Sequence, residues 1–165
     1  MIAHDCVGTN LQETILNTSN VNINDFGLLF RRKVDGHIYT QPLYLPKVEV
    51  PGKGRHNIVY VATQHNTVYA FDADDPAQAE PLWQVNLGPS IPLPNPDIGP
   101  EFYGDIQIEV GTTSTPVIDR AAGILYVVAA TRETESGDCP CQYRHRLHAL
   151  DLATGEERLG GPVVI

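Results

Sequence analysis

The chain has 165 residues, of which 42% are hydrophobic and 19% charged, so it is expected to fold as a globular domain of ordinary size. Eleven Lys and Arg residues against 20 Asp and Glu give a formal net charge of −9. Such an acidic surface repels phosphate backbones and anionic membranes, which argues against nucleic acid as a partner. No apolar run approaches the ~18 residues of a membrane span, so membrane insertion is not expected either.

Residues 1–20 are polar and rich in Asn and Thr, which predicts a loosely ordered lead-in. They lack the basic start and the apolar core of a signal peptide. The chain is therefore expected either to be cytoplasmic or to follow an export signal that lies upstream of it. Three cysteines allow at most one disulfide and do not decide between these compartments.

The first strand candidate is the segment 26–34, which ends at the turn signal Asp35-Gly36. Another strand begins around Pro42, a residue that suits a strand start or an edge. Segments 58–63 and 67–71 are mostly β-branched and aromatic, which predicts two strands joined by a tight turn at 64–66. A second turn then leads to Trp83.

Five prolines between positions 89 and 100 exclude a helix or a central strand, and predict a stiff, extended loop over 88–110. The strand pattern restarts at 114–118 and continues through 124–130 and 147–151. No stretch keeps a helical period over ten or more residues. The fold class predicted from the sequence is therefore all-β.

The two halves of the chain repeat one four-strand unit. Corresponding strands are 41–43 and 115–117, 59–61 and 125–127, 68–72 and 147–151, and 82–83 and 158–159. The proline-to-tyrosine spacing is 18 residues in the first copy and 10 in the second, and the tyrosine-to-alanine spacing is 10 and then 23. Length changes confined to turns are typical of a true repeat, and four strands in up-and-down order are typical of a propeller blade.

The repeated signature is A-[FL]-D-x-x-T-G-x-x-x-W, preceded by a strand like LYVVA and by T-P-V. It resembles the blade signature of the quinoprotein (pyrroloquinoline-quinone) β-propellers over residues 26 to 165. The first copy lacks Thr-Gly, and Leu159 stands where the second copy should have tryptophan. The resemblance implies that Trp83 docks between blades, and it suggests a periplasmic or secreted protein. The signature residues are Pro42, Ala70, Asp72, Trp83, Pro116, Ala149, Asp151, Thr154 and Gly155.

The predicted architecture is a partial β-propeller over residues 21–165, with about two four-stranded antiparallel blades plus flanking strands. Its blades span 41–87 and 111–160, separated by the proline-rich loop 88–110, and 161–165 begin a next strand. A closed propeller has about four to eight blades, so this ring is incomplete. We therefore expect a fragment of a longer protein, partnered by its missing blades or by a self-associating copy.

One face of these blades collects three features: the turn at His65 and Asn66, the loop 88–110 and the insertion 132–145. Loops on a rigid β scaffold commonly carry binding function, so this is the candidate binding face. Carboxylates in the loop suggest calcium, which takes six to eight oxygens, but their spacing fits no known calcium loop and favours a solvated acidic loop. These carboxylates are Asp97, Glu101, Asp105 and Glu109.

Cys139, Cys141 and His145 form a second candidate site, because thiolates and imidazole suit zinc or copper. Three ligands on one loop are one short of a closed structural zinc site. Ordinary loop thiols and a strained Cys139–Cys141 bridge are the alternatives. His148 aligns with Tyr69 and is expected to pack between the blades instead.

Three functions follow from these patterns. The first is a non-catalytic repeat module without a cofactor, acting as a binding or scaffold surface in a larger extracytoplasmic protein. The second is a fragment of a quinone-dependent dehydrogenase, which the resemblance would supply with pyrroloquinoline quinone and calcium at the ring's centre. Against it, the sequence has no adjacent cysteine pair, and its single tryptophan occupies the docking position. The third is a small metal-binding module at the Cys139 loop.

Overall fold

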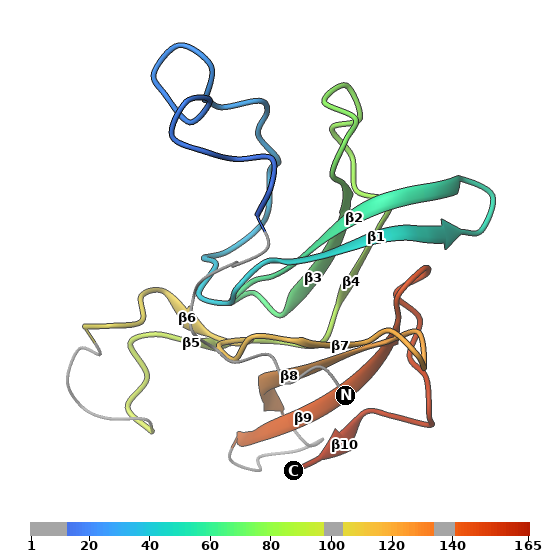
Figure 1. Ribbon diagram of the computed structural model, residues 1–165. Coiled ribbons are helices and arrows are strands. Elements are labelled where there is room, and N and C mark those ends of the chain that lie inside the picture. The colour runs from blue at the N-terminus through green and yellow to red at the C-terminus, as the bar shows by residue number, and fades with distance from the viewer. Residues whose placement is uncertain (1–12, 98–103, 134–140) are drawn as a thin grey trace. The chain divides into compact units, whose positions relative to one another are not determined.

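The computed structural model describes residues 13–97, 104–133 and 141–165 (Figure 1). It divides the chain into two compact units, Met1–Arg31 and Arg32–Ile165. All regular structure in the described residues is β-strand, so the predicted all-β class is confirmed. Among these residues there is accordingly no helix that could cross a membrane.

The first sheet is a four-stranded antiparallel meander in the order β1-β2-β3-β4 (Figure 1). Its strands are β1 (Leu43–Val50), β2 (Gly54–Ala62), β3 (Thr67–Asp72) and β4 (Trp83–Asn86). Every residue of β3 is buried, because this inner strand is rich in apolar side chains on both faces. The strand is thus the centre of the first sheet.

The second sheet repeats this meander, in the order β7-β8-β9-β10. Its strands are β7 (Val117–Asp119), β8 (Ile124–Glu133), β9 (Gln142–Asp151) and β10 (Val163–Val164). Between the two sheets, β5 (Ile91–Pro92) and β6 (Glu109–Val110) form a two-stranded ribbon inside the proline-rich loop. The prolines predicted an extended loop without paired strands over 88–110, but part of this loop forms a ribbon.

Equivalent residues of the two copies occupy equivalent places in the ladders. In the first sheet Tyr60 lies opposite Ala70, and in the second Tyr126 lies opposite Ala149. The main-chain bonds that follow the third strand also correspond, since Leu82 N–H donates to the Ala70 carbonyl and Arg158 N–H to the Ala149 carbonyl, each at 2.7 Å. The register inferred from the repeat is therefore that of the first three strands. The fourth strand predicted at 158–159 is wrong, because only a single bridge from Glu157 to Leu150 forms there and the fourth strand of the second sheet is β10, at Val163–Val164.

The extra residues of each copy lengthen a hairpin instead of forming a loose loop. The β1–β2 ladder runs out to the pair Val50 and Gly54, and the β8–β9 ladder out to Glu133 and Gln142. Cross-strand ion pairs line these extensions, as between Arg55 and Glu49 at 2.5 Å. Such pairs favour continued pairing over an open loop.

The two predicted flanking strands have different outcomes. Residues 26–34 form no strand, and among the described residues β1 pairs with β2 alone. The strand predicted within 161–165 does form, as β10, but it belongs to the second sheet and not to a further unit. Leu159 and Gly160 adopt positive φ and bend the chain back, so that Val163 pairs with Leu147 as the fourth strand of the second sheet.

The main hydrophobic core lies between the two four-stranded sheets. It combines Tyr60 and Trp83 of the first sheet with Leu125, Val127 and Leu150 of the second, among others. A smaller cluster covers the opposite face of the first sheet, where Val34 packs against Tyr69 and neighbouring side chains. The first sheet is therefore buried on both sides.

Two hydrogen bonds join the sheets across the core. The Tyr60 hydroxyl donates to the Leu152 carbonyl at 2.8 Å, and the Trp83 indole N–H donates to the same oxygen at 3.1 Å. The Trp83 ring lies against Gly155, where an added Cβ would come within 2.6 Å of Cε3. The tryptophan of one copy thus rests on the Thr-Gly turn of the other.

The aspartate that ends each third strand organises the turn after it, by accepting main-chain N–H groups. Asp72 Oδ1 accepts the N–H groups of Asp74 and Asp75, and Asp151 Oδ1 accepts those of Ala153 and Thr154. The second oxygen of each carboxylate pairs with a cationic side chain. These are His56 for Asp72, at 2.5 Å, and Arg158 for Asp151, at 2.6 Å.

Candidate functional site

The three segments expected on one face do meet in the structure. His65 from the β2–β3 turn and Arg132 at the end of β8 both line a cavity of about 580 Å³, together with the first residues of the proline-rich loop. Among the described residues its lining is His65, Asn86, Gly88, Pro89, Ser90, Pro92 and Arg132. This cavity is the candidate binding site of the loop face.

Gln64 fixes the β2–β3 turn to the chain that enters the second sheet. Its side chain is fully buried, and it accepts the Gly111 N–H through Oε1 at 2.7 Å. Nε2 donates to the Thr112 carbonyl at 3.1 Å and to the Thr113 hydroxyl at the same distance. A buried amide satisfied at both ends holds the turn rigidly.

Asn66 extends this network toward β8. It adopts a φ of 57°, which asparagine tolerates better than most residues, and its side chain is fully buried. Nδ2 donates to the Ala130 carbonyl at 2.8 Å and to the Gly88 carbonyl at 3.2 Å, and Oδ1 accepts the Thr112 hydroxyl. Asn66 therefore positions the loop face from inside, and its amide is not exposed for an external ligand.

Asp35 clamps the same turn from the other side. Its two carboxylate oxygens accept the hydroxyls of Thr63, at 2.8 Å, and Thr67, at 2.6 Å. The Gln64 N–H also donates to the His37 carbonyl at 2.8 Å. The turn at Asp35-Gly36 therefore does more than change the direction of the chain. It fixes the β2–β3 turn that carries His65.

His65, Glu109 and Ser90 form the polar centre of the loop face. His65 Nδ1 lies 2.9 Å from Glu109 Oε2, and the Ser90 hydroxyl donates to that same oxygen. The Glu109 side chain is 14% exposed and that of His65 is 52% exposed. The hydrogen bond that His65 donates to Glu109 raises the pKa of the His65 imidazole.

This arrangement does not activate the serine as a nucleophile. Nucleophilic catalysis needs the base hydrogen-bonded to the hydroxyl, whereas here both the imidazole and the hydroxyl bond to one carboxylate oxygen. Glu109 is therefore a shared acceptor that holds both donors in place. The cluster is suited to binding rather than to acyl transfer.

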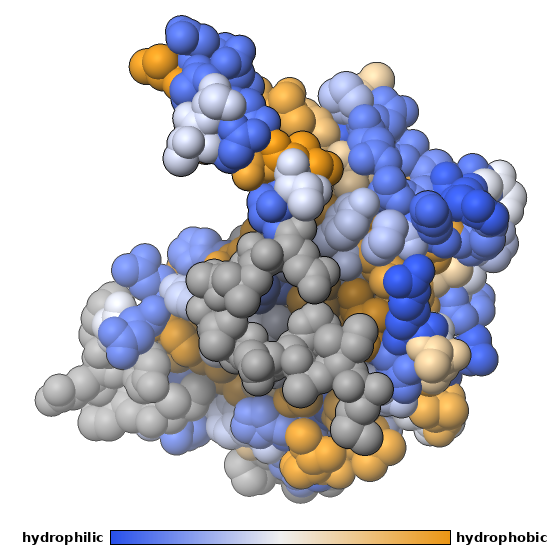
Figure 2. All heavy atoms as spheres, in the orientation of Figure 1, coloured by the Kyte–Doolittle hydropathy of each residue, from blue (hydrophilic) through white to orange (hydrophobic). Residues whose placement is uncertain are grey.

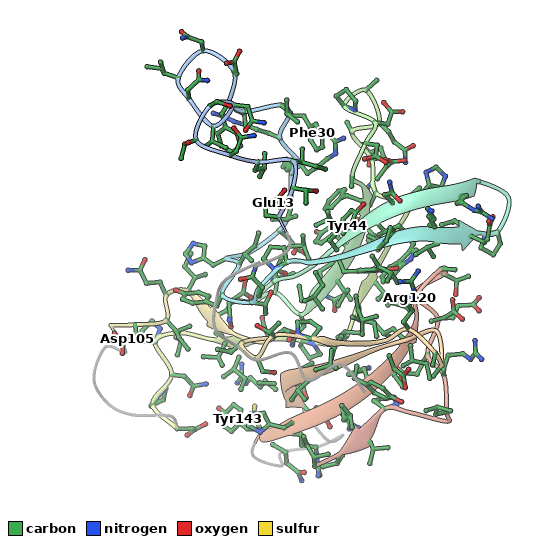
Figure 3. The ribbon with its side chains drawn as sticks, in the orientation of Figure 1. Glu13, Phe30, Tyr44, Asp105, Arg120 and Tyr143 are labelled. Atoms are coloured by element: carbon green, nitrogen blue, oxygen red, sulfur yellow. The ribbon has the colours of Figure 1, made fainter. Side chains whose placement is uncertain are left out.

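The other predicted carboxylates of the loop do not gather into one site. Asp97 accepts the Tyr143 hydroxyl at 2.6 Å, and Asp105 is exposed at the outer end of the loop, apart from Tyr143 (Figure 3). Glu101 lies outside the described residues. Within residues 13–97, 104–133 and 141–165, no three His, Cys, Asp or Glu side chains are close enough together to hold a metal ion.

The predicted metal site falls partly outside the described chain. Cys139 is one of the residues that the structure does not describe, Cys141 is a half-buried free thiol, and His145 is exposed on β9. His148, in contrast, is buried on β9, and its Nδ1 bonds to Glu157 Oε2 at 2.8 Å. Because it lies two residues before Leu150 and opposite Val127, on the face of the strand that carries these core residues, it packs between the sheets as predicted.

Comparison with known proteins gives no relative for this arrangement. No family model matches the chain, and neither a curated protein nor a solved structure is similar to it.

Proposed function

We propose that the chain is a non-catalytic repeat module of the β-propeller type, in which the two four-stranded sheets are consecutive blades and the loop face is a binding or scaffold surface. The observation that carries this proposal is the docking of Tyr60 and Trp83 on the Leu152 carbonyl. Two sheets that share the register of their first three strands, and that are joined by Trp83 of one copy against Gly155 of the other, are what radial repetition of a blade requires.

The resemblance to quinoprotein propellers assigned Trp83 a docking role between blades. The indole of the first copy lies against Gly155 of the Thr-Gly turn in the second, which supports that role. The second copy has Leu159 at the corresponding position, and this residue is 73% exposed. On this proposal Leu159 takes the place of the indole where the second sheet packs against the next blade.

Further sheets of the same kind are the proposed partners. Apolar residues at the outer edges of the second sheet are exposed, among them Val117 of β7 and Val163, Val164 and Ile165 at β10. Figure 2 shows apolar side chains on the surface at the C-terminal end of the chain. Missing blades of one longer extracytoplasmic protein would cover such residues; a second copy of this chain is the alternative source.

The quinone-dependent dehydrogenase is the weaker alternative, because the residues present do not fit the cofactor. The only tryptophan packs against Gly155 with its N–H bonded to Leu152, so no indole is left to stack on a quinone. The sequence also has no adjacent cysteine pair. Addition of pyrroloquinoline quinone and calcium is expected to give no dye-linked oxidation above a control without protein.

The reading frame on both sides of this segment tests the module proposal. Further copies of the Thr-Pro-Val and Ala-Leu-Asp pattern, at repeat lengths comparable to those here, are expected. If the neighbouring reading frame contains no further copies of the pattern, the proposal requires the purified chain of 18.1 kDa to associate with itself. Light scattering after size-exclusion chromatography measures this. A frame without copies and a monomeric particle together contradict the proposal.

A further inference from the structure

The β5–β6 ribbon is held over the end of the second sheet at both of its ends. Two-stranded ribbons are marginally stable alone, so such anchors matter. At one end the Arg132 N–H donates to the Pro89 carbonyl at 3.0 Å. At the other, Tyr143 bonds through its hydroxyl to Asn95 and, at 2.6 Å, to Asp97.

Between these anchors the ribbon borders an apolar cavity of about 310 Å³ that is partly open to solvent. Its roof is aliphatic and comes from the ribbon and the chain beside it: Ile91, Leu93, Ile106 and Val110. Its floor is formed by Ala130 of β8 with Tyr143 and His145 of β9. The volume lies at the lower end of the ~300–1,000 Å³ range of ligand pockets, which suits a small molecule better than a peptide.

One polar group on this cavity is uncommitted. The His145 side chain is exposed, and its imidazole makes no hydrogen bond within the described part of the chain. It lies opposite Ala130 in the β8–β9 ladder, which places it at the edge of the apolar floor. The Tyr143 hydroxyl, in contrast, is already engaged by Asn95 and Asp97, so that only its ring is available to a ligand.

We propose that this cavity binds a small, uncharged, apolar molecule that carries one hydroxyl or amide group. Its apolar body contacts Ile91, Leu93 and Ile106, and its polar group bonds to the His145 imidazole. Among the described residues no carboxylate or amino group lines the cavity, and burying an unpaired charge among aliphatic side chains is costly, which favours an uncharged ligand over an ionic one. An apolar pocket with one placed polar group is the usual form of a small-molecule site. The proposal does not depend on the packing of further sheets.

Phenol and toluene are the probes, because they share a ring and differ in one hydroxyl. Titration of each into the isotope-labelled chain is followed by amide and methyl NMR shifts. Both are expected to move signals of the cavity residues, with phenol bound about 2 to 10 times more tightly, the ratio one hydrogen bond supplies. Absence of binding, or shifts centred elsewhere, overturns the proposal.

Two variants separate the cavity from its polar group. I106W fills the cavity from its half-buried roof and is expected to abolish the shifts from both probes, whereas V117W, on the exposed edge strand β7, leaves them unchanged. H145F keeps an aromatic ring and is expected to bind phenol and toluene equally. If H145F retains the full preference for phenol, the role assigned to His145 is wrong. If I106W binds as the unmodified chain does, the site itself is wrong.

Discussion

The hydroxyl of Tyr60 donates a hydrogen bond to the main-chain carbonyl of Leu152, at 2.8 Å and across the core between the two sheets. The donor belongs to the second strand of the first copy and the acceptor to the turn after the third strand of the second. Burial raises the pKa of Tyr60 well above its ordinary value, so the hydroxyl keeps its proton at any moderate pH. The hydrogen bond between the two copies is therefore independent of pH in this range.

Replacement Y60F is expected to lower the free energy of unfolding by about 0.5–1.5 kcal/mol, the usual worth of one such bond. The loss stays modest because the Trp83 indole still donates to the Leu152 carbonyl. Urea unfolding followed by far-UV circular dichroism measures it. The matched control is Y126F, at the corresponding place of the second sheet, whose hydroxyl makes no bond within the described residues and whose loss should change stability by less than about 0.5 kcal/mol. Equal effects of the two variants would refute the link.

Replacement G155A tests the close approach of the Trp83 ring. Gly155 has a φ of 73°, and its new Cβ would also lie 2.6 Å from the indole. G52A is a matched control, because Gly52 has a φ of 72° and open space around it. In both variants the positive φ costs about 1–2 kcal/mol of stability. G155A is expected to lose about 1 kcal/mol more than G52A, because its Cβ also meets the indole. Thermal unfolding with tryptophan fluorescence compares them; equal melting temperatures would mean that the ring does not rest on this turn.

Replacement G111A tests how tightly the loop face is fixed to the β2–β3 turn. A Cβ at this position would lie 2.0 Å from the Gln64 main-chain oxygen, which cannot move without breaking the buried network. Destabilisation of more than about 2 kcal/mol is expected, together with loss of slow amide exchange at the turn. In G104A the new methyl group meets nothing within 4 Å, so stability should stay within about 0.5 kcal/mol. A mild effect of G111A would show that the turn and residues 111–113 are not locked together.

The pair of His56 and Asp72 is expected to make stability depend on pH. The Asp72 hydrogen bond, and then the bond to the Lys53 carbonyl, raise the pKa of His56 above 6.5. Burial alone would raise the pKa of Asp72, but the Asp74 N–H and the His56 ring outweigh it and hold this pKa below 3.8. The histidine's contribution is thus complete below pH 6.5 and is lost as the pH rises through its folded pKa, and the aspartate's is lost only in strong acid.

The urea midpoint of unfolding, measured at pH values below and above the pKa of His56, tests whether stability falls as the pH rises. The midpoint is expected to fall between about pH 6 and about pH 9, and H56Q should reduce that fall. His65 contributes in the same direction through Glu109, so H56Q leaves part of the effect and the H56Q/H65Q double variant removes more. H37Q changes an exposed histidine and serves as control, because the ion pairs of the two acids are with His56 and His65. A midpoint that rises with pH, or an H56Q curve parallel to that of the unmodified chain, would contradict the assignment.

Most of the fold could be predicted from the repeat of one four-strand unit in the sequence. Strands built around Tyr60, Ala70, Tyr126 and Ala149 could be placed with their register, because apolar and β-branched residues recur at matching positions in both copies. Segment 26–34 is apolar at its start but forms no strand, because pairing is a property of the whole sheet rather than of the segment. The long hairpin ends were missed for a related reason: cross-strand pairs such as Arg55 and Glu49 are visible only once the register is known.

The candidate site was predictable only in outline. A meander puts alternate turns on one face, and this topology was enough to bring His65 together with the loop 88–110 and the residues near 132. The buried amide of Gln64 and the carboxylate of Asp35 carried no local signal, because their partners Gly111 and Thr67 come from distant segments. Asn66 was expected on the binding surface, whereas its buried bonds place it beneath that surface.

Nuclear Overhauser spectroscopy on the indole of Trp83 tests the docking of the two copies most directly. The chain has a single tryptophan, so its ring signals are unambiguous. Cross-peaks from the ring protons to the α protons of Gly155, with those α protons shifted by the ring current, are the predicted result. An indole with cross-peaks only to residues of its own sheet, and Gly155 α protons at ordinary positions, would contradict the docked arrangement.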